Sequence, residues 1–172
     1  MNSFEALIED LESSILEKKI ETIKYIGEVQ YKEFEPILLK LLSNEEDINV
    51  LNALALSLGK LECNEAVPIL MNYIRNPKFK NTRGSFIYAL LDLDCREYFL
   101  DFARMICEGD FEVYSHSFSI FESIVDDVSY ELKFEAKKIL ERQQKIELTK
   151  TESKYPQYER INYINEALEL LN

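Results

Sequence analysis

The feature that most constrains this chain is an internal repeat with a period of about 32 residues. A shift of 32 aligns residues 25–29 with 57–61, 34–38 with 66–70 and 61–65 with 93–97, placing Gly27 on Gly59 and Pro36 on Pro68. A further step of about 34 residues aligns Phe86, Ile87 and Leu90 with Ile120, Phe121 and Ile124. Four phases of one unit are therefore visible. Such a period indicates a stack of repeats rather than an ordinary globular core.

Each unit is predicted to consist of two helices, because its apolar residues follow the i, i+3, i+4, i+7 spacing of a helix. The prolines lie in the first turn of a leading helix, and the glycines lie where a trailing helix ends. We expect helix pairs at 3–16 with 18–27, 34–43 with 48–60, 65–75 with 81–93, and 97–107 with 112–125. A long helix near 128–147, a polar linker from Thr149 to Pro156 and a last helix near 157–171 are expected to follow. The last helix carries an apolar stripe of Ile161, Ile164, Leu168 and Leu171.

The run ALALSLGKLECNEAVPIL, from Ala53 to Leu70, resembles the short bacterial HEAT-like repeat in its Leu-Gly-x-Leu turn and its Ala-x-Pro-x-Leu restart. Residues 20–42 and 82–107 follow the same pattern more loosely. The resemblance implies an all-α fold, a right-handed α-solenoid of about four helix pairs with C-terminal capping helices, used mainly as a binding scaffold. We expect repeats over residues 1–127 and a helical cap over 128–172 within the same domain. Some relatives are bilin chromophore lyases or DNA-repair glycosylases, so the resemblance leaves catalysis open.

Composition narrows the classes of partner. Of the 172 residues, 47% are hydrophobic and 30% are charged, which is enough apolar surface for one folded unit. The net charge of −12 would repel nucleic acid and favours a basic protein partner. No apolar run approaches the roughly 18 residues of a membrane span, and acidic residues near the start argue against a secretory signal. Three cysteines are too few for a disulfide framework, so we expect free thiols in a cytoplasmic protein.

Residues with catalytic or metal-binding chemistry form no recognisable constellation. His116 is the only histidine, so it has no second histidine with which to share a metal and no evident catalytic partner. The three cysteines lack the spacing of a zinc site, and we expect them to be packing residues. The pairs Asp92 with Asp94 and Asp126 with Asp127 lie at predicted helix ends, where acidic residues are common. We therefore predict a protein that is not an enzyme, with no catalytic residue, no cofactor and no metal.

The repeat register predicts which side chains align on the face of the trailing helices, which is usually the concave binding face of such solenoids. One column consists of Lys24, Leu56, Tyr88 and Glu122, and the next of Glu28, Lys60, Asp92 and Asp126. The predicted partner-binding residues are Leu56, Tyr88, Asp92, Glu122, Asp126 and Asp127. The acidic side chains either bind a partner rich in Lys and Arg or only keep the protein soluble.

Small residues recur on the same face, at Ala53, Ser57, Ser85, Ala89, Ser119 and Ser123. Two interpretations of them remain open. The small side chains either form the floor of a shallow groove, or they allow neighbouring helices to pack closely.

Two classes of function remain. In the first, the acidic groove masks a basic protein partner without chemistry, and the chain is similar in kind to immunity proteins that neutralise nuclease toxins of the same bacterium. Opposite charge would speed such a capture. In the second, the groove holds a small molecule, as the resemblance to bilin lyases would allow, or the chain is a general scaffold. A lyase needs a cysteine, histidine or acid converging on a pocket, and the sequence shows no such set.

Overall fold

The computed structural model describes residues 3–149 and 156–172, and every regular element in these ranges is a helix. The all-α prediction is therefore confirmed. The chain divides into two compact units, Met1–Asp94 and Cys95–Asn172, which we call unit 1 and unit 2. Most of the predicted polar linker, residues 150–155, lies outside the described residues.

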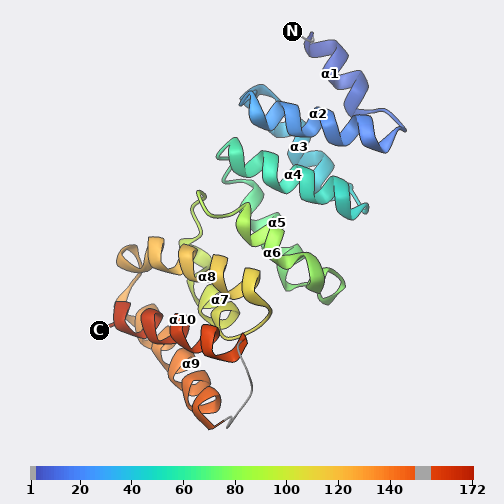
Figure 1. Ribbon diagram of the computed structural model, residues 1–172. Coiled ribbons are helices and arrows are strands. Elements are labelled where there is room, and N and C mark those ends of the chain that lie inside the picture. Colours follow the sequence, from blue (N-terminus) through green and yellow to red (C-terminus); the bar gives the residue numbers. More distant parts are fainter. Residues whose placement is uncertain (1–2, 150–155) are drawn as a thin grey trace. The chain divides into compact units, whose positions relative to one another are not determined.

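Unit 1 is built from helix pairs in which a leading helix packs against a trailing one (Figure 1). Its elements are α1 (Phe4–Leu11), α2 (Leu16–Glu28), η1 (Lys32–Phe34), α3 (Glu35–Asn44), α4 (Ile48–Lys60), α5 (Ala66–Arg75), η2 (Pro77–Thr82) and α6 (Arg83–Tyr88). The trailing helices pack in succession, α2 on α4 and α4 on α6. Leu51, Leu54 and Leu58 of α4 are fully buried, as their helical spacing predicts.

The period of 32 residues is confirmed by equivalent surroundings at equivalent positions. Gly27 in α2 lies against Ser57, and Gly59 in α4 lies against Ala89. The glycine and the residue that it contacts therefore both recur 32 residues later. The turns that follow are also equivalent. Gln30 and Glu62, again 32 apart, follow the ends of α2 and α4. Both have positive φ values, 54° and 59°, the left-handed conformation that is typical of helix ends.

The predicted helix over 3–16 is shorter than expected. The structure ends α1 at Leu11 and begins α2 at Leu16. The hydroxyl of Ser13 accepts a hydrogen bond from the N–H of Ile15 at 3.1 Å. A serine side chain that bonds the nearby backbone in this way competes with helical hydrogen bonds and favours a turn.

The predicted helix over 81–93 is also shorter, because only Arg83–Tyr88 is α-helical. Beyond it the backbone continues with i→i−3 hydrogen bonds, such as the one from the N–H of Leu93 to the carbonyl of Leu90. This repeat has Leu91 at the position where the two preceding repeats have glycine. A bulky side chain there excludes the close helix approach that a glycine allows. Asp92 lies in the turn that follows α6 rather than on a helix.

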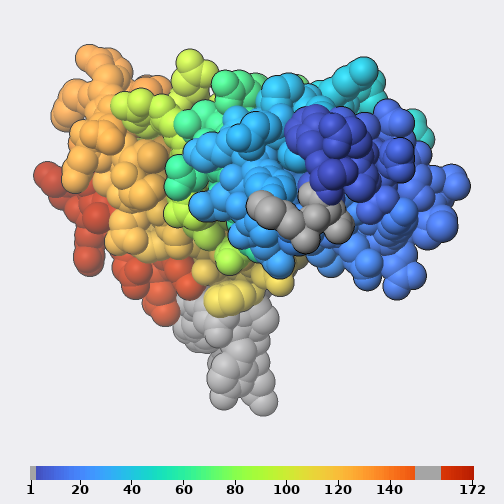
Figure 2. Space-filling model, turned by 90° about the horizontal axis from the view of Figure 1, so that it is seen from above, coloured from blue at the N-terminus to red at the C-terminus, as the bar shows by residue number. Residues whose placement is uncertain are grey.

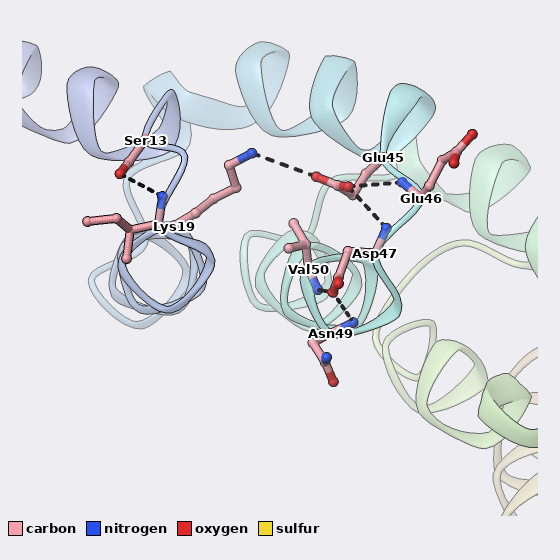
Figure 3. Close-up of polar contacts among 8 residues, drawn as sticks. Ser13, Lys19, Glu45, Glu46, Asp47, Asn49 and Val50 are labelled. Atoms are coloured by element: carbon pink, nitrogen blue, oxygen red, sulfur yellow. Dashed lines mark hydrogen bonds and ion pairs between the residues drawn. The ribbon is translucent and has the colours of Figure 1, made fainter.

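The start of α4 is held by local carboxylates, as Figure 3 shows. Asp47 caps the helix, because its Oδ1 accepts the N–H groups of Asn49 at 2.8 Å and Val50 at 3.2 Å. Glu45 accepts two backbone N–H groups of the preceding loop, and its other oxygen lies 3.8 Å from Nζ of Lys19 in α2. The loop is thereby tied to the preceding repeat.

Unit 2 packs its helices through aromatic side chains. Its elements are η3 (Arg96–Tyr98), α7 (Phe99–Ile106), α8 (Phe111–Ile124), η4 (Val125–Asp127), α9 (Tyr130–Thr149) and α10 (Pro156–Leu170). The ring of Phe99 stacks on Phe121 with a centroid separation of 4.5 Å. Tyr163 of α10 lies 5.3 Å from the ring of Tyr114 and 5.4 Å from that of Phe118, both in α8.

The last helix, α10, covers α8 and α9 within unit 2. Of its predicted stripe, Ile164 is fully buried, and Ile161, Leu168 and Leu171 are half-buried. Ala167, which the predicted stripe omits, is buried as well. The division of the chain into repeats over 1–127 and a cap over 128–172 stays a prediction.

A buried ion pair joins three elements of unit 2. The Glu147 side chain is only 2% exposed, and its Oε1 lies 3.7 Å from Nη1 of Arg160. The same oxygen accepts a hydrogen bond from Gln143 at 2.7 Å. Arg160 also donates to the carbonyl of Gly109 and lies 5.4 Å above the ring of Tyr114. The pair therefore ties α10 to α9 and to the start of α8.

We expect Gly59→Ala to destabilise the protein by about 2 to 3 kcal/mol, because the new Cβ would lie 2.4 Å from the carbonyl oxygen of Ala89. A backbone oxygen cannot move aside as a flexible side chain can, so the clash outweighs the helix propensity gain of about 1 kcal/mol. Urea denaturation measures the change. Lys40→Ala, on the exposed face of α3, is the control and should change stability by less than about 0.5 kcal/mol. Equal stability of wild type and Gly59→Ala would show that the two helices do not meet at this point.

We expect Glu147→Ala to cost about 3 kcal/mol of unfolding free energy, because it leaves the charge of Arg160 without its partner in a largely buried place. Glu147→Gln keeps the volume and a hydrogen-bonding oxygen, so its loss should be smaller. Glu135→Ala is the matched control, since Glu135 pairs with Lys138 at 2.7 Å on the exposed face of α9. Its effect should stay below about 1 kcal/mol. Equal losses for both alanine variants would argue against a stabilising role of the buried pair.

Candidate functional site

Unit 1 contributes three of the predicted partner-binding residues. Leu56 is half-buried on α4, and Tyr88, the last residue of α6, is 53% exposed. Asp92 is exposed in the turn that follows α6. All three therefore belong to the trailing helices or to the turn directly after them, as the register predicts.

The column that contains Asp92 is partly neutralised along its length. Nζ of Lys60 lies 3.9 Å from Glu28 one repeat earlier in the same column, and outside the column Nζ of Lys32 lies 3.8 Å from Glu62. These side chains are more than half exposed, so each pair contributes little stability. Within the part of the chain that the structure describes, Asp92 forms no such ion pair. The acidic surplus on this column of unit 1 therefore lies at Asp92.

The small residues of unit 1 serve helix packing. Ala53, Ser57 and Ala89 are buried, and the hydroxyl of Ser57 donates to the carbonyl of Ile23 at 2.9 Å. Ser57 and Ala89 are the residues that Gly27 and Gly59 approach. Of the two interpretations left open by the sequence, close packing is the correct one for these three residues. They do not form the floor of a groove.

Unit 2 contributes three acidic residues. Glu122 is exposed on α8, and Asp126 and Asp127 follow one turn later in η4. The Asp126 carboxylate is 99% exposed and lies 4.0 Å from Nζ of Lys133 in α9. The two small residues beside them, Ser119 and Ser123, are exposed as well. Unit 2 thus brings Glu122, Asp126 and Asp127 together on its surface.

Both units carry the same charge. Each has 16 acidic and 10 basic residues, which gives a net charge of −6 in each. The acidic surplus is therefore shared equally by the two units. A single groove that joins the residues of the two units stays a prediction.

A cluster that sequence reasoning missed lies in unit 1. The ligating atoms of Glu35, Cys63 and Glu65 all lie within 4.8 Å of one another, and Sγ of Cys63 is 3.6 Å from Oε2 of Glu65. The repeat period could have predicted this cluster, because stacked repeats place the start of α3 beside the turn before α5. Three donors could hold a divalent cation only together with further ligands. Without a cation, the Cys63 thiol stays protonated beside the two carboxylates.

Burial and charge both keep the thiols protonated. Burial and the nearby Glu35 and Glu65 raise the pKa of Cys63 to about 11. Burial and Glu108 raise the pKa of Cys107 to about 12. All three cysteines, Cys95 included, are buried and form no disulfide, as expected of packing residues. With these raised pKa values, Cys63 and Cys107 are poor nucleophiles at neutral pH.

None of the helices in the described ranges combines the length and the apolar character that a membrane span requires.

The repeats of unit 1 identify the protein family to which the chain belongs. A model of HEAT repeats matches residues 4–91, which is about half of the chain and lies within unit 1. The chain belongs to the HEAT-repeat family. No curated protein matches it. HEAT repeats act as scaffolds for protein interaction, so this HEAT-repeat chain is assigned to that general class, and the family is generally non-enzymatic.

We expect Cys63 and Cys107 to react slowly with iodoacetamide at pH 8 in the folded protein, because their pKa values are raised to about 11 and 12 from an ordinary 9. The raised pKa values also stabilise the folded state, and this contribution is fully present below pH 9. That contribution is lost as pH rises from about 9 toward 11 and 12, since the unfolded thiols ionise first. Mass spectrometry of alkylated peptides measures the rates. The protein in denaturant is the control and should react at the ordinary rate; fast labelling of Cys63 in the folded state would contradict the burial.

Proposed function

We propose that this HEAT-repeat protein binds a basic protein partner through the acidic surface of its trailing helices. The observation that carries the proposal is the exposure of the residues that the repeat register selects. Tyr88, Asp92, Glu122, Asp126 and Asp127 are all exposed, whereas their neighbours in the register, such as Ala53 and Ser57, are buried.

The chemistry of these residues suits a surface rich in Lys and Arg. Exposed carboxylates attract such a surface from a distance and accept charge-assisted hydrogen bonds on contact. Tyr88 adds a flat apolar ring with a polar hydroxyl, the kind of side chain that interfaces favour. Within the described residues, Asp92, Glu122 and Asp127 form no ion pair with a lysine or arginine of the protein itself. A partner would therefore not have to displace an existing cation from them.

We further propose a nuclease toxin as the basic partner, so that the protein acts as an immunity protein. A nuclease carries a cationic surface that binds phosphates, and an acidic binder can cover it without catalysing a reaction. The net charge of −6 in each unit would steer capture by such a toxin. A cytoplasmic location would suit such a role.

The partner is found first by site-specific cross-linking. A photoreactive residue at Tyr88 should capture the partner from native cells, and the same residue at Asn72, exposed on leading helix α5, should not. Equal capture from both positions would contradict the proposal that the partner binds to the face of the trailing helices. We expect the captured protein to be a toxin whose gene lies beside the gene of this protein.

We expect Asp92→Lys, Glu122→Lys and Asp126→Lys together to weaken binding of that partner by about 100-fold, because attraction turns into repulsion. Titration calorimetry at two salt concentrations measures the affinity. The control reverses Glu46, Glu97 and Glu166, which are exposed elsewhere and change the net charge by the same amount. An equal loss of affinity in the control would show that the effect comes from the net charge rather than from these three positions. An unchanged affinity in the first variant would refute the surface.

A further inference from the structure

A hollow with aromatic walls lies in the first repeat of unit 1. Phe4 of α1, together with Tyr31, Glu33 and Phe34 at η1, lines this hollow of about 300 Å³, which we call the aromatic hollow. Phe4 is 45% exposed, whereas Phe34 is buried. Figure 2, which looks onto the start of the chain, shows atoms of α1 at the surface beside those of α2. The volume is at the low end of the roughly 300 to 1,000 Å³ of small-molecule sites, so the hollow suits a group the size of one side chain.

Contacts among the rings hold the walls of the aromatic hollow in place. The ring of Tyr31 lies 6.3 Å from that of Phe34 with an angle of 22° between their planes, and Phe4 lies 4.5 Å from Phe34. Tyr25 of α2 meets Tyr31 edge-on at 6.3 Å. The N–H of Phe34 donates to the carbonyl of Tyr31 at 3.0 Å, which fixes the turn between them. Because the rings support one another in this way, a ligand would lose little free energy in ordering them.

One carboxylate at the aromatic hollow has no cation beside it. Glu33 is exposed, and within the residues that the structure describes it forms no ion pair. The neighbouring Lys32 points its Nζ toward Glu62 in the next repeat, at 3.8 Å. Residues 3–17, which include Phe4, contain five acidic residues and no basic one. The faces of aromatic rings are negative as well, so the hollow attracts a positively charged group.

The repeat register shows that stacking of the repeats does not require these rings. Residues 31, 33 and 34 have counterparts 32 positions later, which are Cys63, Glu65 and Ala66. Cys63 and Ala66 are both buried, so the second repeat fills this place with small side chains. The carboxylate recurs in both repeats, whereas the second repeat lacks the two rings. Packing alone therefore does not explain the aromatic residues of the first repeat.

We propose that the aromatic hollow binds an arginine side chain of a second protein. The guanidinium group would lie against the rings of Phe4 and Tyr31, because a cation is attracted to the face of an aromatic ring within about 6 Å of its centre. Two of its N–H groups would donate to the carboxylate of Glu33. The hollow shares no residue with the acidic surface of the proposed function, so this inference stands independently of it.

Arginine suits the aromatic hollow better than other cationic side chains. The guanidinium group is flat and weakly hydrated, so it can stack on a ring and still offer two parallel N–H groups to a carboxylate. The ammonium group of lysine is compact and strongly hydrated, and it loses more hydration on entering an aromatic site. A trimethylated lysine binds ring faces but has no N–H to donate to Glu33. Only arginine therefore uses both the rings and the carboxylate fully.

NMR titration of the full chain with tripeptides whose termini are blocked tests the proposal. Gly-Arg-Gly should move the ring signals of Phe4 and Tyr31 and saturate them at roughly millimolar concentration. Gly-Lys-Gly should bind about fivefold more weakly, because lysine is more strongly hydrated. The same peptide with citrulline, an uncharged analogue of arginine, should bind about tenfold more weakly, because it offers no charge to the rings or to Glu33.

Three variants separate the carboxylate from the rings. Glu33→Gln should weaken binding of Gly-Arg-Gly about tenfold, because the charge-assisted hydrogen bonds are lost. Tyr31→Leu keeps an apolar side chain but removes a ring, and it should weaken binding about threefold. Glu65→Gln is the matched control and should bind like the wild type, because it removes the same charge one repeat later, beside Cys63 and Ala66 instead of rings. Thermal unfolding monitors the folding of each variant, and Glu33→Gln changes only an exposed residue.

Four outcomes would overturn the proposal. The first is ring signals that stay unmoved at about 20 mM Gly-Arg-Gly. Equal binding of the citrulline peptide would overturn it in favour of an apolar hollow, and tighter binding of a trimethyllysine peptide in favour of a site for methylated ammonium groups. An equal loss in Glu33→Gln and Glu65→Gln would show that only the net charge matters. Because the probes are short peptides, none of these outcomes depends on the partner of the proposed function.

Discussion

The close approach of the trailing helices is the contact on which the rest of unit 1 depends. At Gly27 and Gly59 the next helix lies so near that a methyl group would meet Ser57 or the backbone of Ala89. Helices packed at this distance cannot slide along each other, because any other register would bring a larger side chain to the contact. The contact therefore fixes the register. The register in turn determines which side chains of the trailing helices are buried and which are presented to a partner.

Much of this could be predicted from the sequence, because glycine and proline mark the ends of helices at positions 32 apart. The helix pairs, the buried apolar stripes and the exposure of Asp92 and Glu122 follow from that period alone. Two features could not be predicted in this way. The sequence alone does not say whether a serine such as Ser57 faces a groove or a helix, and the apolar spacing over 81–93 does not show that α6 ends at Tyr88. The Glu35 and Cys63 contact requires knowing which turns stacking brings together.

Unit 2 shows why the repeat pattern fades. Its helices are held by stacked rings, such as Phe99 on Phe121, and by the buried pair of Glu147 and Arg160, rather than by glycine contacts. Large rings can be packed in many arrangements, so they impose no fixed spacing on the sequence. A buried ion pair needs only two residues that meet in space. The match to HEAT repeats accordingly ends at residue 91, inside unit 1, although helices continue to Leu170.

Apart from the buried pair of Glu147 and Arg160, the charges of the molecule contribute little to its stability. The stacking contacts are apolar, and the ion pairs between repeats, such as Glu28 with Lys60, are exposed and weak. Surface charge can therefore change without loss of the fold and can be shaped by what the protein binds. Screening limits each exposed charge to a range of about 8 Å, so the local arrangement of acidic and basic side chains matters as well as their sum. A net charge of −12 thus describes how the whole molecule attracts a distant partner, while the local pattern decides where that partner binds.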